Sequence, residues 1–298
     1  MGGRVRLGVL VLPEHAGSSA AEVWRRAEEL GFDHGWTLDH LSWRTLRGKP
    51  WFDAMTTLAV AAGATRKITL GTLVASPNFR HPVVTAAQAR TLDHLSGGRF
   101  VLGIGAGAPG SDSTALGGPE LSLGDRAARF REFVTLVDTL LRNENTTFEG
   151  SYFAARDVCL APLCVQRPRL PMAIAATGAR GMRLAAEYAD TWVTIGDAAD
   201  PGSQSEKDAF RTLREQLGRL EEACLDRGRD PGTLRRLVNL SRLVPAPYRS
   251  PGRLTELVGR SVELGFTDVV LAYPRAEGVF AGDSAQFDNA VTQVRAAA

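Results

Sequence analysis

The sequence of 298 residues predicts a single (β/α)₈ barrel with a small hairpin inserted before its fifth strand. Short apolar segments alternate with helical patterns along the whole chain, which is typical of a parallel sheet covered by helices. The connections that follow the expected strands are longer than those that follow the expected helices, and the length suits one barrel domain over residues 1–298. A doubly wound parallel sheet is the alternative fold.

The expected strands are runs of Val, Ile, Leu and Thr that mostly lack strict alternation, as in parallel strands covered on both faces. They are Val5–Leu12, His34–Asp39, Ile68–Ala75, Phe100–Ile104, Pro171–Ala176, Thr191–Ile195, Arg235–Arg242 and Thr267–Tyr273.

The expected helices carry apolar residues at positions i, i+3, i+4 and i+7. They are Ala20–Leu30, Asp53–Ala64, Val83–Leu95, Asp125–Arg142, Ala179–Tyr188, Glu206–Asp226, Arg253–Leu264 and Ala285–Ala297. Gly97 and Gly98 follow the third of them, where glycine commonly ends a helix.

Loop lengths indicate which end of the barrel carries the site. Long connections follow four of the strands, at His40–Phe52, Gly105–Gly124, Gly196–Ser205 and Pro274–Ser284. Long loops in compact domains are usually functional, and barrel enzymes hold their sites at the C-terminal ends of the strands. The insertion, Thr147–Pro162, is expected to form the hairpin.

Composition excludes several classes of partner. The net charge is +2 and no basic run is present, so neither nucleic acid nor a membrane is an expected partner. No apolar stretch reaches about 18 residues and the N-terminus runs directly into a strand, so neither a signal peptide nor a membrane span is expected.

The cysteines lack metal-ligand spacing, which favours a reducing cytoplasm; they are Cys159, Cys164 and Cys224. The arginine-rich basic set indicates a GC-rich, actinobacterial source.

The inventory of reactive side chains also narrows the chemistry. None of the lysines lies at the C-terminal end of a strand, as a Schiff-base enzyme requires. The histidines are scattered, so no metal site is expected, and no nucleophile elbow is present. The glycines Gly103, Gly105 and Gly107 end a strand and lead into a loop, which disfavours a dinucleotide fingerprint. A cofactor that brings its own electrophile would leave the protein mainly a positioning role.

Asp39 and His40 end the second strand on the expected functional face, close to Trp43. An imidazole there is suited to proton transfer or to stabilising charge near neutral pH, so His40 is a catalytic candidate; a purely structural histidine is the alternative. Trp43 and His15, which follows the first strand, are candidates for substrate binding.

Thr177, Gly178 and Arg180 mark the start of the helix after the fifth strand. Free N–H groups at a helix start and a nearby arginine can bind an anion such as a cofactor phosphate, although an ordinary threonine cap would look the same. Gly105 and Gly107 are expected to allow a ligand close to the backbone, whereas packing explains Gly103 equally well.

Several segments resemble the bacterial luciferase-like monooxygenase superfamily, whose members bind flavin or deazaflavin in a TIM barrel. They are Leu70-Gly71-Thr72 with Pro77, Leu95-Ser96-Gly97-Gly98-Arg99-Phe100 with Gly103-Ile104-Gly105, and Ala185-Ala186-Glu187-Tyr188-Ala189-Asp190. The resemblance implies a non-proline cis peptide bond at Leu73-Val74, behind the cofactor ring.

Asp39-His40 followed by Trp43 resembles the branch of that superfamily that uses coenzyme F420, an 8-hydroxy-5-deazaflavin. The resemblance implies that Asp39 contacts the cofactor and that His40 lies at its reacting face. Sugar-phosphate dehydrogenases of that branch carry a catalytic Glu after the fourth strand, where this chain has Ala108-Pro109-Gly110. Glucose 6-phosphate oxidation is therefore not favoured, and Glu14 is the candidate second acid. The phosphate is expected between Gly107-Ala108 and Thr177-Gly178.

The sequence thus predicts an F420-dependent oxidoreductase that transfers a hydride between C5 of the deazaflavin and a small organic substrate. The reductive direction, on an activated C=C or C=N bond, is favoured because the sugar-phosphate signature is missing. One alternative is an FMN-dependent luciferase-like monooxygenase, which would consume oxygen. The other is a catalytically silent protein that binds flavin or deazaflavin. A homodimer is left open as the assembly.

Overall fold

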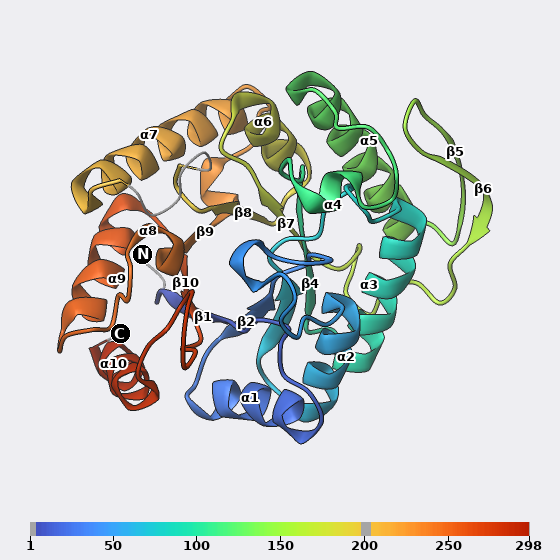
Figure 1. Ribbon diagram of the computed structural model, residues 1–298. Helices are drawn as coiled ribbons and strands as arrows, with labels where there is room; N and C mark the ends of the chain where they lie inside the picture. The colour runs from blue at the N-terminus through green and yellow to red at the C-terminus, as the bar shows by residue number, and fades with distance from the viewer. Residues whose placement is uncertain (1–3, 198–203, 298) are drawn as a thin grey trace.

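The computed structural model describes residues 4–197 and 204–297. Within these ranges eight parallel strands form a closed barrel, with the order β1-β10-β9-β8-β7-β4-β3-β2 around the ring (Figure 1). The barrel strands are β1 Arg6–Leu10, β2 His34–Thr37, β3 Thr69–Thr72, β4 Phe100–Gly105, β7 Met172–Ala175, β8 Thr191–Thr194, β9 Arg235–Asn239 and β10 Asp268–Ala272. The ring closes where β1 pairs with both β2 and β10, so the predicted barrel is confirmed.

A ring of helices covers the outside of the barrel (Figure 1). The long helices are α1 Ser18–Glu29, α2 Ala54–Ala64, α3 Pro82–Ser96, α5 Leu123–Arg142, α6 Ala179–Tyr188, α7 Glu206–Leu225, α9 Arg253–Leu264 and α10 Ser284–Ala297. Short helices lie in the connections: η1 Arg44–Leu46, α4 Ser111–Thr114, η2 Pro231–Thr233 and α8 Leu240–Leu243. None of the helices described is long and apolar enough to cross a membrane.

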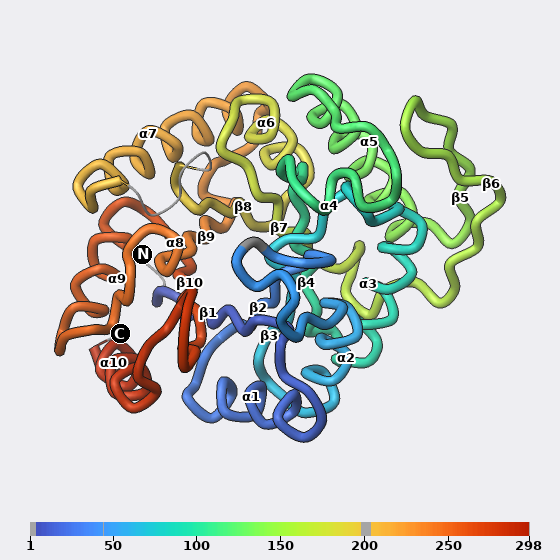
Figure 2. The backbone as a smooth tube through the Cα atoms, viewed as in Figure 1, coloured from blue at the N-terminus to red at the C-terminus, as the bar shows by residue number. Residues whose placement is uncertain are grey.

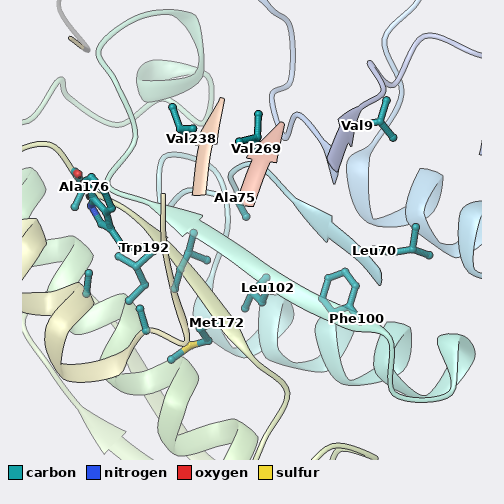
Figure 3. Close-up of a cluster of buried hydrophobic side chains, with 14 of the residues drawn as sticks. Val9, Leu70, Ala75, Phe100, Leu102, Met172, Ala176, Trp192, Val238 and Val269 are labelled. Atoms are coloured by element: carbon teal, nitrogen blue, oxygen red, sulfur yellow. Dashed lines mark hydrogen bonds between the residues drawn. The ribbon is translucent and has the colours of Figure 1, made fainter. Parts of the chain in front are cut away.

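The barrel strands are buried on both faces because their side chains alternate between two apolar clusters. The larger cluster lies between the strands and the surrounding helices, and Figure 3 shows part of it, including Leu102, Met172 and Trp192. The smaller cluster fills the barrel interior and includes Leu10 and Leu237. A run of apolar residues without strict alternation is the sequence pattern that such strands require.

Glycines end three of the helices in the conformation expected from the sequence. Gly97 follows α3 with φ 65° and ψ 42°, and Gly265 follows α9 with φ 102°. Gly31 follows α1 with φ 81°. Positive φ values are readily adopted by glycine, so each helix stops there and the chain turns directly into the next strand.

Two expectations about element boundaries need comment. The predicted hairpin is present as β5 Asn145–Glu149 and β6 Ala154–Cys159, displaced slightly towards the N-terminus. The seventh barrel strand was expected to reach Arg242, and this is wrong: β9 ends at Asn239 and α8 begins at Leu240. The apolar residues after Asn239 continue the core as a helical turn rather than as a strand.

Long connections lie at the C-terminal ends of the barrel strands, as predicted. Residues 38–53 follow β2, residues 106–122 follow β4 and contain α4, and residues 273–283 follow β10. The expected long loop Gly196–Ser205 falls partly on residues 198–203, which lie outside the described residues. On the opposite face, connections such as residues 97–99 and 189–190 are short.

Candidate active site

The predicted site residues lie on the face of the barrel that carries the long loops. Asp39 and His40 follow β2, Leu73 follows β3, Gly105 ends β4 and Thr177 follows β7. Their common face confirms the prediction drawn from loop lengths. Figure 2 shows the loop after β2, in blue, lying over the middle of the barrel in this view.

His40 forms a short contact with a carboxylate that the sequence did not indicate. Its Nδ1 lies 2.6 Å from Oδ2 of Asp112, in the loop after β4. The other oxygen of Asp112 accepts the backbone N–H of Leu41 at 3.2 Å, and Asp112 is 7% exposed. Trp51 donates its Nε1–H to the carbonyl oxygen of His40 at 2.7 Å, so both the backbone and the ring of His40 are held.

An aromatic cluster surrounds His40. Trp43 is buried, and its ring lies nearly parallel to those of His40, Trp51 and Phe280, with centroid distances of 6.4, 6.0 and 6.0 Å. The guanidinium of Arg242 lies 5.8 Å from the Trp43 ring. The site therefore combines the imidazole of His40 and the guanidinium of Arg242 with an aromatic wall built from the loops after β2 and β10.

Asp39, the predicted cofactor contact, is buried beside His40 and is bound by an arginine. Arg80 donates to both carboxylate oxygens of Asp39, at 2.6 and 2.9 Å, and also reaches Asp53 at 2.6 Å. Burial raises the pKa of the Asp39 carboxyl, and the hydrogen bonds and charge of Arg80 oppose that rise. Both carboxylate oxygens of Asp39 are thus bound by Arg80. Contact between Asp39 and a cofactor stays a prediction.

Glu14, the predicted second acid, pairs with Arg275 in the loop after β10. Nε and Nη2 of Arg275 lie 2.7 and 2.8 Å from the two carboxylate oxygens. Both side chains are largely covered, at 14% exposure for Arg275 and 19% for Glu14. Burial lowers the pKa of the neighbouring His15, which favours its neutral form. A catalytic role for Glu14 and substrate contact by His15 remain predictions.

The strand ends predicted to face the cofactor ring lie close together. The peptide bond between Leu73 and Val74 is cis, as predicted. A Cβ at Gly105 would lie 2.7 Å from Cγ2 of Val74, and one at Gly103 would lie 1.7 Å from the carbonyl oxygen of Thr72. Protein atoms therefore explain both glycines, because close packing against the end of β3 and against Val74 leaves no room for a side chain.

Gly107 is likewise set by its protein neighbours. Its φ is +76°, and a Cβ there would lie 2.5 Å from Oδ1 of Asn78. Asn78 is buried and donates to the carbonyl oxygen of Ala108 at 2.9 Å, while Arg129 donates to Asn78 at 2.6 Å. Ligand approach at Gly105 and Gly107 stays a prediction, and the loop after β4 is fixed from beneath by this network.

Two arginines on α5 lie against the same loop with unfilled hydrogen-bonding capacity. Arg126 donates to the carbonyl oxygen of Gly107 at 3.2 Å. The Nε atoms of Arg126 and Arg129 are both buried, and neither has a hydrogen-bond partner in the described part of the chain. Burial and the positive charge of Arg126 lower the pKa of Arg129. An anion would relieve both the repulsion and the missing hydrogen bonds.

The start of α6 lies near this arginine pair. Gly178 is the N-cap residue and no side chain caps the helix, so free N–H groups remain at its start. A Cβ at Gly178 would meet open space, and Nη1 of Arg180 lies 3.8 Å from the Cβ position of Gly124, two residues before Arg126. The structure thus places Arg180 beside the first turn of α5, which contains Arg126, while Arg129 lies one turn further along the helix.

The sequence missed Asp112, Arg126 and Arg129. Asp112 lies 72 residues from its partner His40, and no local pattern links them. The arginines on α5 resemble the solvated face of an amphipathic helix. Only the expected closeness of the loops after β2, β4 and β7 could have drawn attention to charged residues in these segments.

Comparisons with known proteins agree with this geometry. A family model described as luciferase-like monooxygenase matches residues 5–245. An F420-dependent glucose-6-phosphate dehydrogenase of Intrasporangium calvum is 36% identical over 221 residues, which are 70% of this chain and 65% of that protein. A 4-hydroxyprotoasukamycin monooxygenase of Streptomyces nodosus subsp. asukaensis is 33% identical over 212 residues, 67% of this chain and 55% of that protein. The matches thus span less than two thirds of either relative.

A solved structure extends the likeness of the fold over the remaining residues. An F420-dependent secondary alcohol dehydrogenase, in complex with an F420-acetone adduct, superposes with a TM-score of 0.80. The alignment covers 98% of this chain and all of that chain, at 20% sequence identity. At this identity the likeness concerns the fold alone.

Proposed function

This chain belongs to the luciferase-like monooxygenase family, and we propose that it is an F420-dependent oxidoreductase. In this proposal a hydride is exchanged between the deazaflavin and a small organic substrate. Support comes from the relative named as an F420-dependent dehydrogenase and from the chemistry of the loops at the barrel mouth.

The residues fit a cofactor that combines a flat ring with a phosphate. Leu73, Val74 and Ala175 offer small or apolar side chains at the ends of β3 and β7, which suits the ring. A phosphate needs convergent N–H donors and positive charge. The uncapped start of α6, Arg180 and the partly unsatisfied pair Arg126 and Arg129 supply both beside the Gly107-Ala108 loop.

The observation that carries the catalytic part is the placement of His40. It lies at the C-terminal end of β2, with one ring nitrogen engaged by Asp112 and 35% of its side chain exposed. The reduced deazaflavin would supply the hydride when bound. His40 would hold or deliver the proton that completes the reduction, and Trp43 with Phe280 would provide the apolar wall beside the substrate.

We infer that the enzyme works as a reductase of an activated C=C or C=N bond. The loop after β4 has Ala108-Pro109-Gly110 where the sugar-phosphate dehydrogenases that the chain resembles carry an acidic residue. The buried acid of this loop, Asp112, is bound to His40. Glu14, the other candidate acid, is paired with Arg275.

The test is a titration of the purified protein with F420 and, separately, with FMN, followed by single-turnover oxidation of reduced F420 by a panel of enones and imines. We expect micromolar or tighter binding of F420, and substrate-dependent return of the absorbance of the oxidised deazaflavin. Absence of F420 binding would contradict the proposal. Binding without turnover by any acceptor would favour a protein that only binds the cofactor.

An FMN-dependent monooxygenase is the second candidate, because one relative carries a monooxygenase name. The two activities differ in their use of oxygen. Reduced FMN with the protein would then consume oxygen in step with product, whereas the proposed F420 reaction would proceed at the same rate under anaerobic conditions.

A further inference from the structure

The two carboxylate oxygens of Asp112 contact two adjacent residues of the loop after β2. Oδ2 lies 2.6 Å from Nδ1 of His40, and Oδ1 accepts the backbone N–H of Leu41 at 3.2 Å. Asp112 itself is 7% exposed, and its helix α4 lies in the loop after β4. This one side chain therefore joins two loops of the barrel mouth and fixes the imidazole at the same time.

We propose that Asp112 is a positioning residue that selects the tautomer of His40. An ionised carboxylate only accepts hydrogen bonds, so the nitrogen that faces it at 2.6 Å carries a proton. In the neutral ring the lone pair is then on Nε2, and in the charged ring the proton next to be lost is on Nε2. All proton exchange with a substrate is thereby directed to Nε2. The inference rests on the proposed function, in which His40 serves the reacting bond.

The other contacts of His40 do not make this choice. Trp51 binds the backbone carbonyl oxygen of His40, which leaves both ring nitrogens unaffected. The Trp43 ring lies at 28° to the imidazole plane and restricts how the ring tilts. Neither contact decides which nitrogen is protonated, whereas the carboxylate does.

The resulting step is balanced for the reductive direction. Reduced F420, when bound, would supply the hydride that reduces the substrate double bond and would itself be the group oxidised. The electron pair of that double bond takes the proton from Nε2 of His40. The ring of His40 then keeps the proton on Nδ1, which remains hydrogen-bonded to the carboxylate of Asp112, and solvent returns a proton to Nε2.

The first measurement is the tautomer itself, read from ¹⁵N shifts of histidine-labelled protein without cofactor, with His40→Gln used for assignment. We expect Nδ1 to be protonated in the wild-type protein and a mixture or the opposite tautomer in Asp112→Ala. Asp112→Glu should restore the wild-type pattern in part. An unchanged His40 tautomer in Asp112→Ala would overturn the proposal.

The second measurement is single-turnover hydride transfer together with cofactor affinity. Asp112→Ala should lower the transfer rate about 10²–10⁴-fold, with affinity for F420 changed less than threefold, and Asp112→Glu should recover part of the rate. Glu120→Gln, an exposed acid in the same loop, is the matched control and should leave both unchanged. A changed tautomer with a normal rate would remove Asp112 from the catalytic apparatus.

The two measurements separate this inference from the proposed function. If wild-type protein transferred no hydride from reduced F420, the function would be wrong, while the tautomer shift would still report whether Asp112 orients the ring. If wild-type protein is active but neither tautomer nor rate responds to Asp112→Ala, only the positioning role fails.

Discussion

Glu14 and Arg275 are separated by 261 positions in the chain, yet they form an ion pair through two parallel hydrogen bonds. The pair ties the loop after β1 to the loop after β10. Arg275 also donates to the carbonyl oxygens of Glu277 and Val279, so a single guanidinium shapes the segment that presents Phe280 to Trp43. Phe280 has a φ of +59°, which is unfavourable for a bulky residue and needs support from its surroundings.

Glu14→Gln should lower the free energy of unfolding by about 1–3 kcal/mol, the range for a charge-assisted hydrogen bond that is lost in a largely covered position. It should also speed proteolytic cleavage in residues 274–283. Urea denaturation and limited proteolysis measure the two effects. Glu277→Gln is the control, because the substitution keeps the backbone oxygen that accepts from Arg275 and removes only a more weakly acting charge from this exposed residue. Equal behaviour of the two variants would show that the pair does not hold the loop.

The arginine group on α5 and α6 should bind the cofactor phosphate. Arg180→Ala should weaken F420 binding by about 1–3 kcal/mol, and Arg126→Gln should do so to a similar extent, because each removes a charge-assisted hydrogen bond. Fluorescence titration measures the affinity. Arg131→Gln provides a control on the same helix, since Arg131 pairs with Glu187 instead. Unchanged affinity in both test variants would place the phosphate elsewhere.

His40→Ala should act on the chemical step more than on binding. Removal of a positioned acid–base group lowers rates about 10²–10⁴-fold. Affinity for F420 should change by less than about tenfold, or roughly 1.4 kcal/mol. Single-turnover transfer and fluorescence titration are compared in the same preparation. Near-normal transfer in this variant would reduce His40 to a packing role beside Trp43.

Arg80 is expected to be needed for stability. Arg80→Leu would leave the buried carboxylate of Asp39 without its partner, which typically costs about 3–5 kcal/mol. Asp53→Asn should cost less than about 1 kcal/mol, because that side chain is 43% exposed and asparagine still caps α2. The urea midpoints of the two variants at neutral pH measure the two losses of stability. Equal losses in the two variants would mean that burial of Asp39 is not the reason.

Acid should destabilise the barrel through the pair His34 and Asp268 at its N-terminal end. Burial alone would raise the pKa of Asp268, but the contact with Nε2 of His34 at 3.1 Å, the hydrogen bond from Thr267 and the charge of Arg235 hold it at about 2. Since the unfolded pKa is about 3.9, the stabilisation is complete above roughly pH 4 and is lost as the pH falls towards 2, for a total of about 2–3 kcal/mol.

Burial lowers the pKa of His34, so the folded protein also loses stability as the pH falls below the unfolded value of about 6.5. Urea midpoints between pH 7 and pH 3 should therefore fall in two steps. Asp268→Asn should remove the lower step and His34→Gln the upper one. A flat profile from pH 7 to pH 5 in wild-type protein would contradict the assignment to His34.

The barrel could be predicted because its strands are buried on both faces, and such strands leave long apolar runs in the sequence. The end of α3 could be predicted because a helix commonly ends on a residue in the left-handed conformation, and glycine, here Gly97, adopts that conformation most readily. The end of β9 could not be predicted, because Leu240 and Leu243 are as apolar in a helical turn as they would be in a strand. Local composition does not distinguish the two.

The site could be predicted only where its residues follow a strand directly. His40 lies next to the end of β2, and the topology fixes its face. Asp112 and Arg126 belong to a long loop and to the first turn of a long helix, and their partners lie in other segments. Such contacts depend on how the loops fold across the barrel mouth, which no periodicity in the sequence encodes.

The pairing of β1 with β10 determines when the barrel can be completed during synthesis. Arg6–Leu10 is synthesised long before its second neighbour, Asp268–Ala272, because β2 to β9 and the helices between them precede β10 in the chain. Until then β1 has one unpaired edge, which can associate with other exposed strands. A product ending at residue 245 would keep β1 to β9 and still expose the edges of both β1 and β9. Such a truncated chain should aggregate rather than form a smaller domain, and ribosome-bound chains should need shielding of these edges until the last strand emerges.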